Sequence, residues 1–144
     1  MDEHSRYRQG DKHDGGAADG RRDASRGRRQ VVGRFGEDVA ARHVTALGWT
    51  VLDRNWRGAR GELDLVARDG DEIVAIEVKT RTTTALGHPA LAVGPAKLAR
   101  LGRLAGQWLA EHTARAASVR IDVIAVVLSP SGAASLEHLR GVQP

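Results

Sequence analysis

The chain has 144 residues, enough for one domain with a sizeable core and little else. It contains no cysteine, which excludes disulfide bonds and thiolate zinc sites and is typical of a reducing cytoplasm. Its 22 Lys and Arg residues against 18 Asp and Glu residues give a net charge of +4, which modestly favours a polyanionic partner. The charged N-terminus and the lack of any apolar run near the roughly 20 residues of a membrane helix predict neither a secretory signal nor a membrane span.

Residues 1–30 have a different composition from the rest of the chain. They hold eight Lys and Arg and six Asp and Glu residues, and Tyr7 is the one large apolar side chain after the initiator Met. Such a segment buries too little apolar surface to offset its ordering entropy, so we predict a disordered charged N-terminal tail. Its end, Arg21 to Arg29, is basic and suits non-specific phosphate binding. The alternative is a solvated leader or a misassigned start codon.

From Val31 onward the pattern predicts a folded domain. Apolar residues between Val32 and Leu47 recur at helical spacing, and Gly48 supplies a stop. Residues 49–56 are rich in strand-forming side chains. Two strands within residues 62–80 flank a turn at Asp69-Gly70-Asp71, which predicts a hairpin.

The second half of the domain contains a loop, a helix and further strands. Residues 82–94 read as a loop, and Pro95 suits the first turn of a long helix that follows it. The pattern predicts an apolar strand over residues 118–128 and an additional edge strand over residues 135–140. The predicted fold is α/β, a single domain over residues 31–140 with a central mixed β-sheet flanked by helices in the order αβββαβ(β).

The predicted hairpin carries charge inside an apolar frame. Its charged side chains are Glu62, Asp64, Glu77 and Lys79. A loop with an even number of residues places Asp64 opposite Ala75 or Glu77, and all four charges then line one face about 5 Å apart. The apolar partners expected together on the other face are Leu63, Leu65, Ile76 and Val78. An odd loop would oppose charged and apolar residues, which the pattern disfavours.

Three carboxylates close together repel each other unless positive charge occupies the cluster. Lys79 supplies one charge, and Mg²⁺ or Mn²⁺ suits a set of oxygen ligands without cysteine. A bound ion would polarise a phosphoryl oxygen and activate water, so this arrangement favours phosphodiester hydrolysis, with Lys79 stabilising negative charge. The alternative interpretation is an ion-pair ladder on a solvated sheet face.

Several other residues admit two interpretations. Glu37 lies on a stripe of small residues in the first helix, and is either a further metal ligand or an exposed acid on the helix flank. The arginines that flank the proposed site either clamp phosphates or are solvated loop residues: Arg54, Arg57, Arg60 and Arg81. The later helix offers Lys97 and Arg100 on the face opposite its leucines.

Aromatic and buried polar residues are better explained by packing than by binding. The three tryptophans, Trp49, Trp56 and Trp108, are expected in the core rather than stacked on bases. Asp122 interrupts an apolar strand, and we favour a structural pairing with an arginine over support of the site. His88 in the predicted loop is a candidate substrate contact.

An ordered set of short motifs resembles the YraN-like family of bacterial proteins. These motifs are Gly36-Glu37, Arg54-Asn55-Trp56, Gly61-Glu62-Leu63-Asp64-Leu65, Glu77-Val78-Lys79-Thr80-Arg81 and Arg120-Ile121-Asp122-Val123-Ile124. The similarity covers residues 31 to about 130 and leaves the first thirty outside. That family is similar in turn to the PD-(D/E)xK nuclease superfamily and, within it, to archaeal Holliday-junction resolvases.

The resemblance implies a restriction-endonuclease-like core. By motif position, Glu37 matches the acid of the first helix, Asp64 the metal-binding acid, and Glu77 and Lys79 the E-x-K pair. Lys97 matches a basic helix position that contacts phosphate. Leu63 stands where the superfamily name has proline. The resemblance also implies two-fold homodimers, because resolvase-like enzymes cut two strands symmetrically.

Three functions are compatible with these observations. The first is a Mg²⁺- or Mn²⁺-dependent endonuclease that hydrolyses DNA phosphodiester bonds, at branched or damaged DNA, with Glu37, Asp64, Glu77 and Lys79 as its catalytic cluster. The second is a nucleic-acid-binding protein on a nuclease fold that does not cut, because a fold can outlast its activity. The third is a protein-interaction module with a solvated charged sheet face.

Overall fold

The computed structural model describes residues 16–82 and 93–143 of the chain, which divides into two units, residues 1–30 and 31–144. Helix α1 spans Gly16–Ala46, so residues 16–30, which we expected to be disordered, are helical. Extending an existing helix is far cheaper than nucleating one, so a polar segment with few strong helix breakers can continue a helix that packing stabilises further along. The predicted loop of residues 82–94 and His88 fall largely or wholly outside the described residues.

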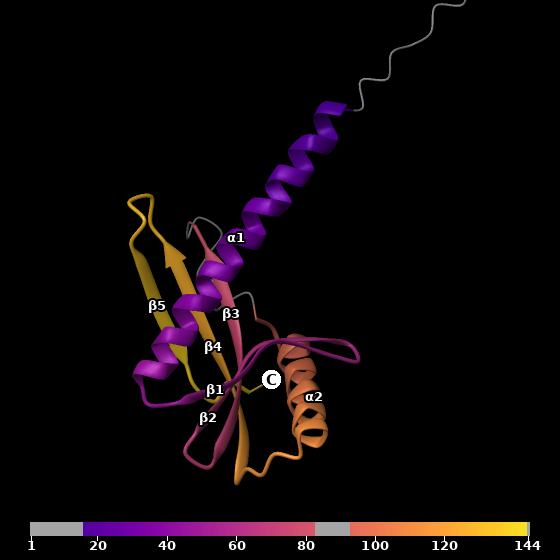
Figure 1. The fold of residues 1–144 in the computed structure, drawn as a ribbon, viewed down its shortest axis with the longest axis vertical. Coiled ribbons are helices and arrows are strands. Elements are labelled where there is room, and N and C mark those ends of the chain that lie inside the picture. Colours follow the sequence, from indigo (N-terminus) through magenta and orange to yellow (C-terminus); the bar gives the residue numbers. More distant parts are fainter. Residues whose placement is uncertain (1–15, 83–92, 144) are drawn as a thin grey trace, which may run out of the picture. The chain divides into compact units, whose positions relative to one another are not determined.

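The five strands form one mixed sheet in chain order, β1-β2-β3-β4-β5 (Figure 1). The remaining elements are β1 (Thr50–Gly58), β2 (Gly61–Asp69), β3 (Glu72–Arg81), α2 (Pro95–His112), β4 (Ser118–Leu128) and β5 (Ala134–Leu139). Neighbouring strands are antiparallel except β3 and β4, which run parallel and are connected through α2. The predicted α/β class, mixed sheet and element order are confirmed. In the described residues, no helix is long and apolar enough to cross a membrane.

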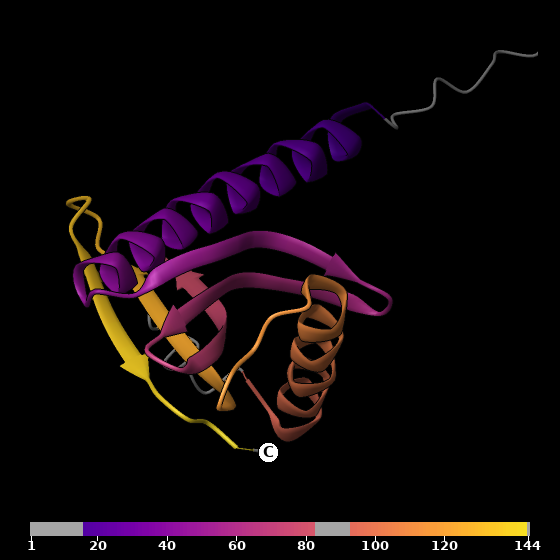
Figure 2. The ribbon, with the colours of Figure 1, turned by 60° about the horizontal axis from the view of Figure 1, so that its bottom comes forward.

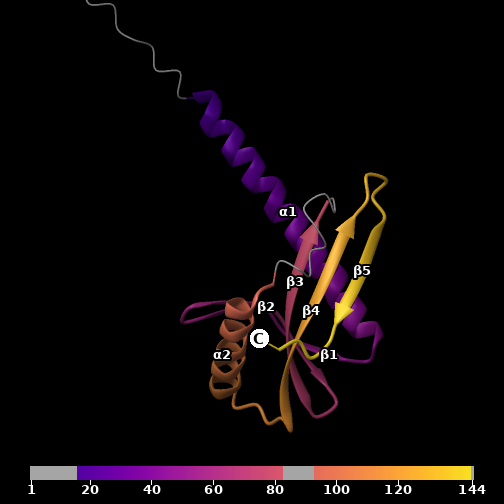
Figure 3. The ribbon, with the colours of Figure 1, turned by 180° about the vertical axis from the view of Figure 1, so that it is seen from behind.

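Two apolar clusters cover the two faces of the sheet. On one face, α2 contributes Leu98, Leu101 and Trp108 to a cluster with Val66 and Val123. On the other face, α1 contributes Ala40 and Val44 to a cluster built on β2, β3 and β4. Figure 2 shows α2 beneath the β1–β2 hairpin, and Figure 3 shows β3, β4 and β5 side by side from behind. The helices therefore flank the sheet, as predicted.

The β2–β3 hairpin has the register that its charge pattern predicts. Asp69 pairs with Glu72 around the two-residue loop of Gly70 and Asp71, and the pairing continues to Leu65 opposite Ile76. Gly70 has a φ of 58°, a left-handed conformation that favours glycine. Because the loop is even, Asp64 falls on the same face as Glu77, one position beyond the last backbone pair.

Leu63 does not pack with Leu65, contrary to our expectation. Leu65 lies in the cluster on the α1 face, whereas Leu63 belongs to the cluster on the α2 face. The part of β2 that precedes Leu65 in the chain is not paired with β3 and pairs with β1 alone. The β1–β2 hairpin then turns over α2, so closely that a Cβ on Gly58 would lie 2.7 Å from a methyl carbon of Leu104.

Asp122 is fully buried and completely hydrogen-bonded. Its carboxylate accepts bonds from Arg120 Nε at 2.8 Å, His138 Nε2 at 2.7 Å and the Gly141 N–H at 3.0 Å. Burial acts to raise the pKa of Asp122, yet the bonds from His138, Arg120 and Gly141 lower it below its ordinary value. Arg120 also stacks over Trp49, 5.1 Å from the ring centroid. The structural interpretation of Asp122 is confirmed.

A close contact between α1 and β3 predicts a sharp response to one added methyl group. A Cβ on Gly36 would lie 1.7 Å from Thr80 Oγ1, whereas a Cβ on Gly33 would meet nothing within 4 Å. We expect Gly36→Ala to lower the free energy of unfolding by about 1–3 kcal/mol, because the helix must move off the strand.

Urea unfolding followed by circular dichroism measures this effect, with Gly33→Ala as the matched control. That control replaces glycine in the same helix without a clash and should be neutral or stabilising by up to about 1 kcal/mol. Equal effects of the two substitutions would contradict the close contact.

Candidate functional site

A groove opens where β2 and β3 separate, on the face that α2 covers. It has a volume of about 340 Å³. Its lining residues are Gly61, Glu62, Asp64, Glu77, Val78, Lys79, Lys97, Arg100 and Leu101. The structure therefore brings together all four charged residues of the hairpin, and it adds Lys97 and Arg100 from α2.

Asp64 replaces a backbone bond at the point where the two strands part. Its Oδ2 accepts a hydrogen bond of 2.8 Å from the Val78 N–H. Burial and, next, the negative charge of Glu77 raise the pKa of Asp64 to about 7, while the bond from Val78 acts in the opposite direction. The surroundings of Asp64 thus disfavour the negatively charged form of its carboxyl group.

Glu77 is buried and carries two ammonium groups on a single oxygen. Glu77 is 5% exposed to solvent. Its Oε1 lies 3.1 Å from Lys97 Nζ and 3.6 Å from Lys79 Nζ. A buried carboxylate is costly without such partners. This observation disfavours the interpretation of the charged residues as a solvated ladder.

Glu37 lies close to the pair electrostatically but does not line the groove. Gly36 brings α1 against Thr80, the residue after Lys79, and the negative charge of Glu37 contributes to the raised pKa of Asp64. In the described part of the chain, no three His, Cys, Asp or Glu residues form a group that could hold a metal ion. The structure therefore assembles two of the three predicted metal ligands, Asp64 and Glu77, and leaves Glu37 apart from them.

Two carboxylates still fit a Mg²⁺ or Mn²⁺ ion. Mg²⁺ keeps several waters and usually takes one or two carboxylates from a protein. Asp64 uses one oxygen for the Val78 N–H, which leaves Oδ1 for other partners. Burial is the largest cause of the raised pKa of Asp64, followed by the negative charge of Glu77, and a divalent cation would offset both.

Comparison with known proteins places the chain. The family model described as "Uncharacterised protein family UPF0102" matches residues 36–126, which include every charged residue of the groove and Glu37. The chain belongs to the UPF0102 family. The resemblance of the sequence to an uncharacterised bacterial family is thereby confirmed.

Several UPF0102 proteins are similar over most of their length. One from Beutenbergia cavernae is 58% identical over 114 residues, covering 79% of this chain and 97% of the relative. Others from Frankia alni and Streptomyces coelicolor are 54% and 53% identical, covering 78% and 79% of this chain and 94% and 89% of theirs.

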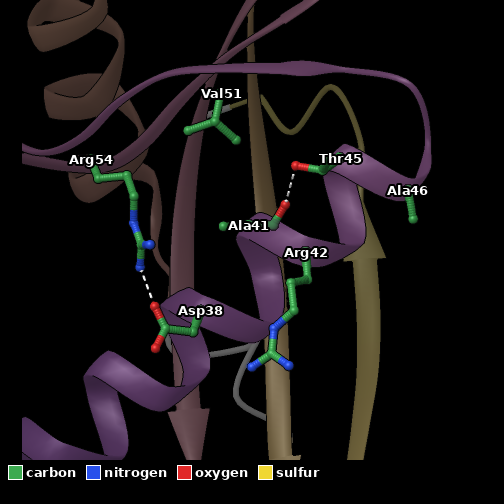
Figure 4. Close-up of a pocket in the computed structure, with 7 residues that line it drawn as sticks. All are labelled: Asp38, Ala41, Arg42, Thr45, Ala46, Val51 and Arg54. Carbon is green, nitrogen blue, oxygen red and sulfur yellow. Dashed lines mark hydrogen bonds and ion pairs between the residues drawn. The ribbon is translucent and has the colours of Figure 1, made fainter.

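Arg54 points away from the groove of this UPF0102 chain. A bulge between Val51 and Asp53 shifts the alternation of β1, which turns Asp53 toward α2 and Arg54 toward α1. Figure 4 shows Arg54 reaching Asp38 across a second groove, of about 740 Å³, and the two side chains form an ion pair. The bulge is a local irregularity that the alternating pattern did not reveal.

The other predicted phosphate-binding residues have different positions. Arg57 is largely exposed and lies 3.7 Å from Glu62, Arg60 is exposed in the β1–β2 turn, and Arg81 is half-buried at the end of β3. Lys97 and Arg100 do line the groove. The bond from Lys97 to Glu77 was not predicted, because α2 is distant in sequence and no pattern relates it to β3.

The tryptophans pack as expected. Trp49 and Trp108 are 7% and 3% exposed, and Trp56 packs against the α2 cluster. Trp108 donates its Nε1–H to Asp53 at 3.0 Å, and His112 stacks on its ring. Trp49 and Trp108 are therefore core residues, and Trp56 packs at the edge of the core.

The raised pKa of Asp64 predicts a pH-dependent effect of Asp64→Asn. Because the folded pKa is about 7 against an ordinary value of 3.8, the stability that the proton contributes is complete below pH 4 and is lost as the pH rises through about 7. Asparagine mimics the protonated acid. In EDTA, we expect Asp64→Asn to match the native protein most closely in urea unfolding below pH 4 and to exceed it in stability by a margin that grows toward pH 8.5.

Asp38→Asn is the control for this experiment. The hydrogen bond from Arg54 lowers the pKa of Asp38, so its carboxylate contributes stability above its ordinary pKa, and the substitution should stabilise at neither pH. An Asp64→Asn effect of the same size at both pH values would show that the carboxyl group is not perturbed.

Proposed function

We propose that the protein is a metal-dependent endonuclease that hydrolyses DNA phosphodiester bonds. The observation that carries this proposal is the grouping of Asp64, Glu77 and Lys79 in one groove. Two acids beside an ammonium group suit the binding of a divalent cation next to a phosphate. Lys97 and Arg100 add positive charge on the α2 side, where a phosphate chain would run.

A restriction-endonuclease-like core of the PD-(D/E)xK kind is part of the proposal. Three features of the fold support it: the acid lies on β2, the E-x-K pair lies on β3, and the preceding helix carries Glu37. Action on branched or damaged DNA, as a two-fold homodimer, follows from the same resemblance. Action in the cytoplasm is proposed because the chain contains no cysteine.

The residues of the groove have distinct roles in this mechanism. Held by Asp64 and Glu77, Mg²⁺ or Mn²⁺ would supply a polarised phosphoryl oxygen and an acidified water. Asp64 must be deprotonated to act as a ligand, and the Val78 N–H fixes its orientation. Lys79 stabilises the negative charge that develops on the phosphate, and Lys97 and Arg100 orient the nucleic acid.

A second candidate function is nucleic-acid binding without hydrolysis. The two ammonium groups on Glu77 Oε1 favour it, because they already neutralise the carboxylate without any metal ion. The groove would then bind phosphate through Lys97 and Arg100 alone. The burial of Glu77 counts against the third alternative, a solvated interaction surface.

Cleavage assays distinguish these functions. Linear duplex, single-stranded and four-way-junction DNA would be incubated with the protein in Mg²⁺, Mn²⁺ or EDTA. We expect metal-dependent cleavage that falls by about 100-fold or more in Glu77→Gln and Lys79→Met, because each removes a group that contacts the reacting phosphate or its cation.

Glu62→Gln is the matched control, since Glu62 lines the same groove but is exposed and lies against Arg57. It should retain cleavage within a few-fold of the native protein. Salt-sensitive DNA binding without cleavage would establish the second candidate function. If the protein neither bound nor cleaved DNA, both candidate functions would be overturned.

A further inference from the structure

We infer that Lys97 acts as an internal counter-ion, which occupies Glu77 until a nucleic-acid phosphate draws it away and thereby couples cation entry to nucleic-acid binding. This inference rests on the proposed function and names how its site is regulated. It follows from the position of the Lys97 ammonium group beside the carboxylate of Glu77.

The ammonium group of Lys97 is the nearer of the two on Glu77. It lies 3.1 Å from Oε1, against 3.6 Å for Lys79. The side chain of Glu77 is 6% exposed, whereas that of Lys97 is 33% exposed. The carboxylate is therefore fixed in the interior, and its partner can move toward solvent along a flexible four-carbon stem.

The two lysines are held by different parts of the fold. Lys79 follows Glu77 by two residues on β3, so strand geometry keeps both side chains on one face. Lys97 comes from the first turn of α2, across the groove. Lys97 can thus leave Glu77 without any change in the sheet, while Lys79 stays beside it.

A divalent cation shared by Asp64 and Glu77 would compete with Lys97 for the same carboxylate. An ammonium group paired with a buried acid offsets part of the cost of burying that charge, so the ion must displace a partner that stabilises Glu77. A phosphate in the groove offers that ammonium a new partner of the same charge as Glu77. Cation and phosphate should therefore each raise the affinity for the other.

Binding of Mn²⁺ to the DNA-free protein tests the first half of this inference. Free Mn²⁺ is counted by electron paramagnetic resonance at pH 8 for the native protein and for Lys97→Met, Lys97→Gln, Arg100→Met and Glu77→Gln. We expect Mn²⁺ to bind about tenfold more tightly to both Lys97 variants, because one strong competing bond to Glu77 is removed.

Arg100→Met is the matched control, because Arg100 is one helical turn from Lys97 and lines the same groove. It removes the same charge but none of the contacts described for Glu77, so Mn²⁺ affinity should stay within about twofold of native. Equal gains in the Lys97 and Arg100 variants would replace the specific bond by a general field effect and overturn the inference.

The remaining outcomes separate this inference from the proposed function. Mn²⁺ binding that is lost in Glu77→Gln but unchanged in the Lys97 variants would keep the metal site and overturn the role of Lys97. An affinity too weak to detect in the native protein and in both Lys97 variants would overturn the metal site, and with it both proposals.

The second half concerns coupling and is tested by DNA binding. Fluorescence anisotropy of a labelled DNA duplex gives its affinity in EDTA and in Ca²⁺ for the native protein and Lys97→Met. We expect Ca²⁺ to tighten DNA binding by about tenfold in the native protein and by several-fold less in Lys97→Met. The same ratio in both proteins would show that Lys97 does not couple the two ligands.

Discussion

The hydrogen bond from the Val78 N–H to Asp64 determines the geometry on which the candidate site depends. Backbone pairing between β2 and β3 ends at Leu65 and Ile76, because β2 continues with β1 over α2. Asp64 supplies by side chain the acceptor that the departing backbone no longer offers. Its carboxylate is thereby held beside Glu77 in a partly buried place, where two negative charges would otherwise separate. Strand divergence thus creates both the groove and its unbalanced charge.

The buried Asp122 and the partly buried Asp64 differ in how their negative charges are neutralised. Asp122 is surrounded by donors from Arg120, His138 and Gly141, and its pKa is lowered despite burial. Asp64 has one backbone donor and an acidic neighbour, and its pKa rises to about 7. Ion pairs that serve structure alone are normally satisfied within the protein. The proposed cation site is therefore built on the acid whose pKa is raised rather than on the acid whose pKa is lowered.

The sequence predicts the features of this protein that depend on side-chain periodicity and on whether a hairpin loop has an even or an odd number of residues. Element order, the mixed sheet and the shared face of Asp64 and Glu77 follow from alternation and from the even loop at Gly70 and Asp71. Local irregularities escape such reasoning: the bulge in β1 redirects Arg54, and the turning of the hairpin over α2 moves Leu63. Contacts between distant elements, such as Lys97 with Glu77, depend on tertiary packing that no local pattern records. Amino-acid composition does not predict that residues 16–30 are helical, for a related reason. The extension of a helix depends on a neighbouring segment that is already folded.

The contact between Gly141 and Asp122 ties the segment after β5 to a buried residue of β4. The Gly141 N–H bonds to the carboxylate, and the Val142 N–H bonds to the carbonyl of Ile121, so the segment after β5 closes over a fully buried charge. A chain shortened to Leu139 would lack the Gly141 N–H and would leave the buried carboxylate of Asp122 with one hydrogen-bond donor fewer. The segment after β5 thus helps to fix β4, and this protein needs residues 141 and 142 in place to reach its full stability.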